Sequence, residues 1–305
     1  MTSIRVLPEV ATALAAGRPV VALESSVLAQ GLPIPQNREA AARMTRAVEQ
    51  GGAVPAVTAV VRGVATLGLA PDELERFLSR DGVRKVAARD LPVAIVQGAD
   101  GATTVAASLC IASRAGASVF ATGGIGGVHR DAPFDESGDL IELARTPMVV
   151  VCAGAKSILD LHATLERLET LGVTVVGYQT DELPGFFTTT TGLRLSARAD
   201  TPGEIAAIFR ASRALGRRQA TLVVQAPPAA VALPQSEVDA AVADALRQAR
   251  SSGISGAATT PFLLGAVLKA TAGRSLLTNL GLLEQNAALA ALIAVALGKE
   301  ADTAH

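Results

Sequence analysis

The chain has 305 residues, of which 50% are hydrophobic and 18% are charged, and its formal net charge is -1. This composition can bury a large core, and the length is compatible with a single domain over residues 1–305. The near-neutral charge gives no global field that would attract nucleic acid or an anionic membrane, so we expect neither as a partner. Cys110 and Cys152 lie in apolar runs and the first residues lack a signal-peptide pattern, so we expect reduced core cysteines in a cytoplasmic protein.

Short β-branched runs alternate with helical segments along the chain. The runs cover residues 18–25, 56–61, 92–98, 117–124, 147–154, 173–179 and 220–226. Runs that are apolar on both faces are typical of a covered, largely parallel sheet. The segments 37–52, 102–116 and 157–172 have helical spacing and end in glycine, as helices often do. The pattern predicts an α/β fold, a three-layer αβα architecture with a largely parallel central sheet.

Two other features complete the predicted organisation. The Ala-rich stretch at 287–298 is shorter than a bilayer requires and predicts a buried terminal helix. The least regular segments are 31–38, 128–139 and 180–195. Ligands of α/β sheets bind at the carboxyl ends of strands, where such loops emerge, so we expect function there.

Two residues at predicted strand ends could carry chemistry. Glu24 follows the apolar run VVAL, where a carboxyl group could act as a general acid, although a helix cap or a surface carboxylate would fit the same pattern. Lys156 ends the run VVVCAGAKS, so its amine could enter a cleft with apolar walls and form an imine with a sugar aldehyde. A solvated lysine near a helix start remains the alternative for Lys156.

Two further segments suggest a site for anions or a metal. The glycine-rich loop 121–139 contains a histidine and several carboxylates, and one carboxylate with waters would suit magnesium or manganese. In QGADGATTVAAS (97–108) a turn precedes a predicted helix, whose free N–H groups could hold a phosphate, with Lys85 as a balancing charge. Helix capping would explain these threonines equally well. No Walker A or complete dinucleotide motif is present, so ATP or NAD dependence has no support.

Several longer strings are more specific than these single residues. The strings VALESSVLAQGLPIPQN, KVAARDLP, GATTVAAS, FATGGIGGVHR, FDESGDL and VVCAGAKSILD occur in one order through almost the whole chain. In these strings the chain resembles the pseudouridine-5'-phosphate glycosidase family, also called the indigoidine-synthase-A-like family. The resemblance implies a reversible, metal-dependent lyase or glycosidase in pseudouridine catabolism. Such an enzyme would cleave the C–C glycosidic bond of pseudouridine 5'-phosphate to uracil and ribose 5-phosphate. It also implies a homotrimer with one divalent ion per subunit, Mn²⁺ or alternatively Mg²⁺.

The resemblance assigns roles to individual positions. It makes Glu24 the proton donor, Lys156 the covalent nucleophile that forms a Schiff base, and Asp135 the metal ligand. The positions that would contact substrate are Lys85, Val105, Thr122, His129, Ser137, Gly138, Asp139 and Asn279. Asn286 is the alternative to Asn279 as the asparagine that would recognise uracil.

The chain departs from the family pattern at two places. Gln30 stands where the family usually has a histidine, and QAPP at 225–228 stands where the family commonly has ANPIP. Neither departure removes a residue with an implied chemical role. Contacts of the 225–228 loop with substrate are therefore the part of the resemblance that is least supported.

Two other classes of function fit parts of the sequence. A non-catalytic sugar-phosphate-binding protein would need the phosphate site but not Glu24, Lys156 and Asp135 together. A sugar or nucleoside kinase is suggested only by the glycine-rich loop, and the sequence has no recognisable nucleotide loop.

Overall fold

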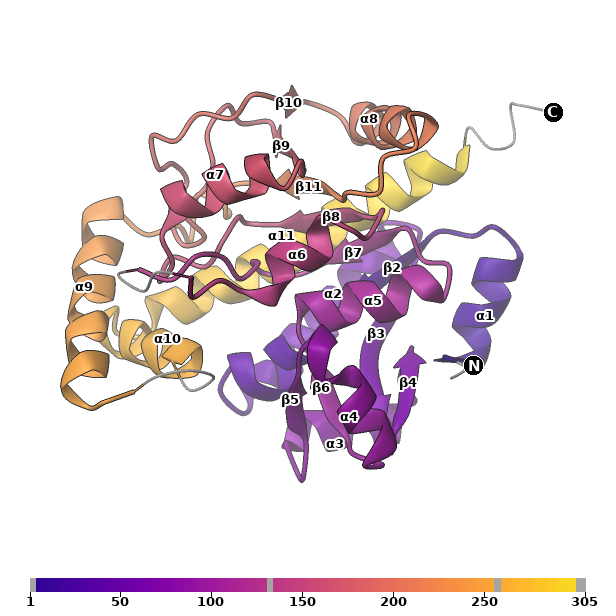
Figure 1. Cartoon of the computed structure of the whole chain (residues 1–305), viewed down its shortest axis with the longest axis horizontal. Coiled ribbons are helices and arrows are strands. Elements are labelled where there is room, and N and C mark those ends of the chain that lie inside the picture. Colours follow the sequence, from indigo (N-terminus) through magenta and orange to yellow (C-terminus); the bar gives the residue numbers. More distant parts are fainter. Residues whose placement is uncertain (1–3, 131–133, 255–258, 300–305) are drawn as a thin grey trace.

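The computed structural model describes residues 4–130, 134–254 and 259–299; Asp131 of the predicted loop lies outside these ranges. One mixed sheet runs through the described chain (Figure 1). Its strands lie in the order β1 (Arg5–Val6), β4 (Val64–Leu67), β3 (Val54–Val61), β2 (Val20–Leu23), β7 (Val119–Ala121), β8 (Val149–Cys152), β11 (Thr221–Val224), β9 (Thr174–Tyr178) and β10 (Arg198–Ala199). From β3 to β10 every pairing is parallel.

A small antiparallel extension leaves this sheet at β3. Strand β4 and strand β6 (Gly101–Thr103) both pair antiparallel with β3, and β5 (Arg84–Val86) pairs parallel with β6. The extension matters for function because β5 carries Lys85 and β6 leads directly into a helix.

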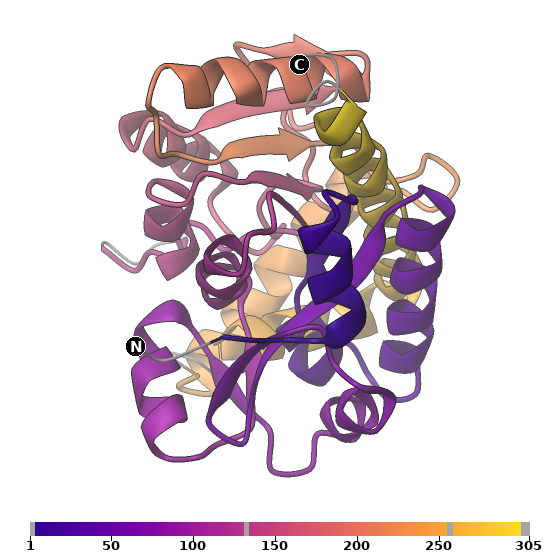
Figure 2. The same ribbon diagram turned by 90° about the vertical axis from the view of Figure 1, so that its right-hand side faces the viewer.

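Helices cover both faces of the sheet. They are α1 (Pro8–Ala15), α2 (Gln36–Gln50), α3 (Pro71–Ser79), α4 (Leu91–Val96), α5 (Val105–Arg114), α6 (Gly138–Leu143), α7 (Leu161–Thr170), α8 (Pro202–Ala214), α9 (Gln235–Ser251), α10 (Thr259–Ala270) and α11 (Arg274–Lys299). In Figure 1, α5, α6 and α7 lie in front of the strands and α11 lies behind them. Figure 2 shows α2 beside α11, and the two helices pack against each other. The α/β prediction of a largely parallel sheet between helical layers is confirmed.

The strand prediction at 92–98 is wrong, because this segment is helix α4. Pro92 stands in its first turn, where a missing N–H costs nothing. Leu91 and Ala94 are buried while Val93 and Val96 are exposed, a spacing of three that one helical face produces. A short apolar run does not distinguish a strand from a helix by periodicity alone.

The predicted terminal helix is longer than expected, because α11 begins at Arg274. By length and composition Arg274–Gly298 could cross a membrane, although 56% of its most apolar part is buried inside the fold. Its buried face, which includes Leu283, Ala287 and Ala290, packs against α2, α8 and strands β2, β7 and β8. These contacts are those of a core helix.

The sheet register brings the predicted strand-end residues together. Leu23 of β2 pairs with Ala121 of β7, and Ala121 pairs with Val151 of β8. Glu24 and Thr122 therefore leave neighbouring parallel strands at the same level, and Lys156 follows β8 by four residues. The carboxyl ends of these central strands form the floor of the candidate site.

Candidate active site

A pocket lies at the carboxyl ends of β2, β7 and β8. It is lined by Glu24, Ser26, Val27, Gln30, Gly31, Lys85, Thr122, Gly123, Gly124, Lys156, Phe186, Thr260, Pro261, Leu264 and Asn279. Five of the predicted site residues, distant in sequence, therefore share one cavity. They are Glu24, Lys85, Thr122, Lys156 and Asn279.

The carboxyl group of Glu24 is buried and held by two hydroxyl groups. Thr122 Oγ1 donates to Glu24 Oε2 at 2.6 Å, and Ser26 Oγ donates to Glu24 Oε1. Glu24 is only 5% exposed, so these two bonds take the place of water around the carboxylate. They fix the direction in which Glu24 can exchange a proton with a ligand.

A cluster of fully buried hydroxyl groups anchors the end of β2 beneath Glu24. Ser25 Oγ accepts the backbone N–H of Thr103 at 2.8 Å, and Thr58 Oγ1 donates to the carbonyl of Leu23 at 3.0 Å. Thr58 and Thr103 are themselves linked, and Ser108 of α5 joins both. The cluster ties β2 to β3, β6 and α5, so the position of Glu24 is coupled to the start of α5.

Lys156 is half-buried, and its Nζ donates to the carbonyl of Gly124 at 3.0 Å. Glycine is required at 124, because a Cβ there would lie 2.6 Å from Cδ2 of Phe186 and 3.0 Å from the carbonyl of Gly154. The close approach lets the Gly124 carbonyl hold the amine at the wall of the pocket. Phe186 closes this side with a backbone φ of 67°, in the left-handed region that a phenylalanine rarely adopts.

Lys85 lies at the edge of the pocket and remains exposed to solvent. Its pKa is lowered, first by partial desolvation in the recess and then by the charge of Lys156. Glu24 and Asp139 act in the opposite direction, which shows that four charged groups share this region. An anionic ligand would relieve the repulsion between Lys85 and Lys156.

Asp139 does not present a free carboxylate to the pocket. Its Oδ1 accepts the backbone N–H of Ala106 at 2.9 Å and its Oδ2 accepts that of Gly126 at 2.8 Å. Ser137 caps α6 by accepting the N–H of Asp139 at 3.2 Å, and a Cβ on Gly126 would collide with Ser137.

The residues Ser137, Gly138 and Asp139, which were predicted to contact substrate, therefore connect the glycine-rich loop to the start of α5 through the hydrogen bonds of Asp139. Of the triplet, Gly138 is exposed. The side chain of Val105 is buried, so only its backbone at the first turn of α5 could contact a phosphate.

Asp135 and His129 lie outside the pocket, in the same glycine-rich loop. The Asp135 side chain is 58% exposed, its Oδ1 lies 3.3 Å from His129 Nδ1, and its carbonyl accepts the His129 N–H at 3.0 Å. No group of three metal-binding side chains occurs within the described residues. One exposed carboxylate fits a hydrated Mg²⁺ or Mn²⁺ ion, which is held partly by waters and partly by phosphate oxygens of a substrate.

The two candidate asparagines occupy different surroundings. Asn279 lines the pocket, and its buried Oδ1 has no hydrogen-bond partner. Asn286 donates to the carbonyl of Thr122 at 2.8 Å and accepts from Gln225 Nε2 at 2.9 Å, so both ends of its amide are engaged. Asn279 is thus the asparagine available to a ligand, and Asn286 fastens the Thr122 backbone to α11. Gln225, the first residue of the QAPP departure, supports Asn286.

Several residues of the site and its support are not predicted as site residues from the sequence, among them Ser26, Phe186 and Gln225. Ser26 was overlooked although it stands two residues beyond Glu24 in the string ESS, a spacing that could have indicated it. Phe186 lies in the irregular segment 180–195, for which only a loop was expected, and Gln225 contacts Asn286 across 61 residues. No local pattern announces contacts of this kind.

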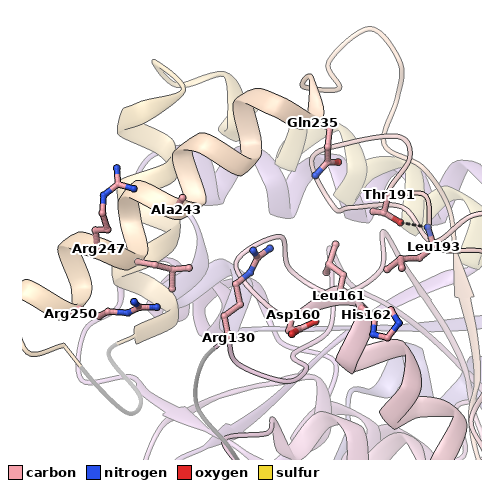
Figure 3. Close-up of a pocket in the computed structure, with 11 residues that line it drawn as sticks. Arg130, Asp160, Leu161, His162, Thr191, Leu193, Gln235, Ala243, Arg247 and Arg250 are labelled. Carbon is pink, nitrogen blue, oxygen red and sulfur yellow. Dashed lines mark hydrogen bonds between the residues drawn. The ribbon is translucent and has the colours of Figure 1, made fainter.

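A larger hollow of about 630 Å³ lies elsewhere, between the start of α7, the 180–195 loop and α9 (Figure 3). Its polar residues include Arg130, Asp160 and Arg247, each of which is already engaged. Arg130 donates to the carbonyl of Leu159, Asp160 caps α7, and Arg247 pairs with Asp244. None of the predicted catalytic residues lines this hollow, so the smaller pocket is the candidate active site.

Comparisons with known proteins indicate the family of the chain. Residues 9–296 match the family described as indigoidine synthase A like protein. The chain is 66% identical over 285 residues to a pseudouridine-5'-phosphate glycosidase of Gemmatimonas aurantiaca, with 93% of each chain covered. It is 51% identical over 299 residues to one of Herpetosiphon aurantiacus, covering 97% of this chain and 99% of the relative.

Two solved structures are similar along the whole chain. One is the prealnumycin C-glycosynthase AlnA in complex with ribulose 5-phosphate, with a TM-score of 0.92 and 38% identity over 99% of both chains. The other is an indigoidine synthase A-like protein of Thermotoga maritima, with a TM-score of 0.88 and 33% identity over 97% of both chains.

Proposed function

The chain belongs to the indigoidine synthase A-like family, and we propose that it cleaves the C–C bond of pseudouridine 5'-phosphate through a Schiff base on Lys156. Its activity is that of a pseudouridine-5'-phosphate glycosidase, as its identity to glycosidases of that name over almost the whole chain indicates. One observation carries the proposed mechanism: the amine of Lys156 and the carboxyl group of Glu24 line one pocket, beyond the carboxyl ends of β8 and β2, the two strands that flank β7.

The bond to be broken explains why an amine is needed. Ordinary glycosidases use two carboxyl groups, because their leaving group departs on a heteroatom that accepts a proton. In pseudouridine 5'-phosphate the departing atom is C5 of uracil, so protonation of a heteroatom at the bond is not available. An amine bonded to C1' can instead supply an electron pair that expels carbon.

The first step opens the sugar ring. Neutral Nζ of Lys156 attacks C1', the C1'–O4' bond breaks, and Glu24 gives its proton to O4'. Nζ then returns a proton to the Glu24 carboxylate, which can pass it to C5 in the next step, and regains its lone pair. The hydroxyl groups of Ser26 and Thr122 stabilise the carboxylate that Glu24 becomes, because both already donate to it.

The second step releases uracil. The Nζ lone pair forms a C=N bond to C1', the C1'–C5 bond breaks, and C5 takes up a proton. Water then hydrolyses the imine to ribose 5-phosphate and free Lys156, so the sum is substrate plus water to uracil plus ribose 5-phosphate. The relative crystallised with ribulose 5-phosphate supports an open-chain pentose phosphate, because that sugar has its O5 blocked by phosphate.

The charged end of the pocket would bind the phosphate. Lys85 lines the pocket and supplies a positive charge away from the bond that breaks, and we propose that the backbone at the start of α5, where Asp139 already accepts the N–H of Ala106, would add donors. Mn²⁺ or Mg²⁺ at Asp135 would add a Lewis acid that neutralises phosphate charge when bound. We further propose that the enzyme acts as a homotrimer in pseudouridine catabolism, as the family resemblance implies.

A synthesis assay tests this function directly. Purified protein is incubated with uracil and ribose 5-phosphate, with and without Mn²⁺, and pseudouridine 5'-phosphate is measured by chromatography. We expect product from the wild type, none from Lys156→Ala, and wild-type yield from Lys269→Ala, a variant of an exposed lysine on α10. Undiminished product from Lys156→Ala would refute the imine mechanism.

A further inference from the structure

Two buried amide oxygens in the pocket lack hydrogen-bond partners. They are Oε1 of Gln30 and Oδ1 of Asn279. Among the described residues that line the pocket, only these two side chains carry such an atom. A buried acceptor without a donor is costly, so a pair of them in one cavity indicates a ligand that brings two donors.

The two amides lie at the end of the pocket that faces away from the reactive groups. A second hollow adjoins the pocket and shares Gln30, Gly31, Pro261, Leu264 and Asn279 with it. Glu24, Lys85 and Lys156 do not line this second hollow. The pocket therefore has a charged end, suited to a sugar phosphate, and an amide end.

The walls of the amide end suit a flat ring. Pro261 and Leu264 supply apolar surface at this end, and Val27 and Phe186 supply it elsewhere in the same pocket. Gln30 belongs to a five-residue π-helix, Val27–Gly31, a distortion that is frequent at functional sites. Its Nε2 donates to the carbonyl of Val83 at 3.5 Å, which leaves Oε1 as the end available to a ligand.

The leaving base of the proposed substrate has the matching donors. Uracil that is attached through C5 has N–H groups at both N1 and N3, whereas uracil attached through N1 keeps only the N3 donor. We propose that Gln30 is a specificity-determining residue whose Oε1 accepts one ring N–H while Asn279 Oδ1 accepts the other. This inference rests on the proposed function, and it makes the amide pair a selector of C-linked over N-linked uracil.

The test compares three substrates and a pair of variants. The substrates are pseudouridine 5'-phosphate and its 1-methyl and 3-methyl derivatives, each of which lacks one ring donor. For the wild type we expect kcat/KM to be lower by a factor of about ten or more for each derivative than for the unmodified substrate, because each derivative leaves one amide oxygen unpaired. Gln30→Ala should lower kcat/KM for the unmodified substrate by a similar factor. For the derivative that lacks the donor to Gln30, kcat/KM of Gln30→Ala should equal that of the wild type.

Controls separate this role from a structural one. Gln36→Ala changes a glutamine six residues away that does not line the pocket, and it should behave as wild type. Gln30→Met preserves the side-chain length if Gln30→Ala unfolds, and the thermal shift with ribose 5-phosphate reports on the charged end of the pocket. Unchanged cleavage of pseudouridine 5'-phosphate by a folded Gln30 variant would overturn the inference alone. No uracil release by the wild type from the unmodified substrate would overturn the proposed function and the inference with it.

Discussion

At the scale of residues, the positive charge of Lys85 is disfavoured in the recess that it shares with Lys156. The lowered pKa of Lys85 means that its charged form is disfavoured in the folded chain, by desolvation and by Lys156. This cost is fully present below the folded pKa. It disappears as pH rises from the folded pKa towards the unfolded value of about 10.4, so stability contributed by this group increases across that window.

The first prediction concerns Lys85→Met, which removes the charge and retains most of the side-chain length. At neutral pH we expect a melting temperature equal to or above that of the wild type, and a difference that shrinks as pH rises towards 10. The affinity for ribose 5-phosphate should fall about tenfold or more, because a charge-assisted hydrogen bond is lost. Differential scanning fluorimetry across pH, with and without the sugar phosphate, measures both effects. A lower melting temperature with unchanged affinity would contradict this account of Lys85.

Residue types at strand ends were the part of the site that the sequence could predict. Glu24 and Lys156 each follow an apolar run, and the parallel sheet brings those runs to one edge. The choice between Asn279 and Asn286 could not be made in the same way. Both asparagines lie on α11. They are distinguished by the hydrogen bonds of Asn286 to Thr122 and Gln225 and by the position of Asn279 in the pocket.

At the scale of elements, the site depends on how α11 is joined to the end of β7. Asn286 of α11 donates to the carbonyl of Thr122, and Gln225, which follows β11, donates to Asn286. Gln285 donates in turn to Gln225 Oε1 at 2.9 Å. These amide hydrogen bonds join the ends of β7 and β11 to α11, next to Thr122, the residue that donates to Glu24.

The second prediction follows from this network. Asn286→Ala leaves the Thr122 carbonyl and Nε2 of Gln225 buried without these partners, which should cost about 1–3 kcal/mol in the free energy of unfolding. Because Thr122 then shifts relative to Glu24, kcat should fall more than KM rises. Urea denaturation and steady-state kinetics measure the two effects. Gln248→Ala, at an exposed glutamine of α9, serves as the control and should change neither quantity.

Elements were predicted where pattern and length agreed, as for α5 and α7, which lie within segments of helical spacing, and for α2, which begins one residue before such a segment. The sequence predicts a strand in place of helix α4 because PVAIV contains four apolar residues in a short run. Only Leu91 and Ala94 of this helix are buried, and that one-sided burial is set by the tertiary fold and cannot be read from the run itself. No sequence pattern predicts the π-helix at Val27–Gly31, although this helix places Gln30 in the pocket.

At the scale of the whole molecule, the loop that carries Asp135, the proposed metal ligand, is set apart from the candidate active site. Asp135 is exposed and does not line the cavity that holds Glu24 and Lys156. This separation fits the proposal of an ion that assists phosphate binding rather than one that takes part at the bond being broken. It also explains why the chain itself offers so few ligands, since waters and phosphate oxygens would complete the set.

The third prediction concerns Asp135→Asn. We expect a several-fold rise in KM and in the Mn²⁺ concentration needed for half-maximal rate, with a much smaller change in kcat, because the ion acts on binding. Titration of Mn²⁺ into chelator-treated enzyme, followed by uracil release, measures this. Asp181→Asn, at an exposed carboxylate beyond β9, is the matched control. An Asp135→Asn enzyme with wild-type KM and metal requirement would show that the carboxylate does not hold the ion.

The proposed mechanism requires a covalent bond between Lys156 and the sugar. The small number of lysines in the chain simplifies the test for this bond. The sequence contains four lysines, Lys85, Lys156, Lys269 and Lys299. Borohydride reduces an imine to a stable amine, so peptide mass spectrometry after reduction in the presence of ribose 5-phosphate locates the attachment. We predict one pentose phosphate adduct on the peptide that contains Lys156, and none in Lys156→Ala. An adduct on another lysine at equal yield, or no adduct in an enzyme that releases uracil, would contradict the mechanism.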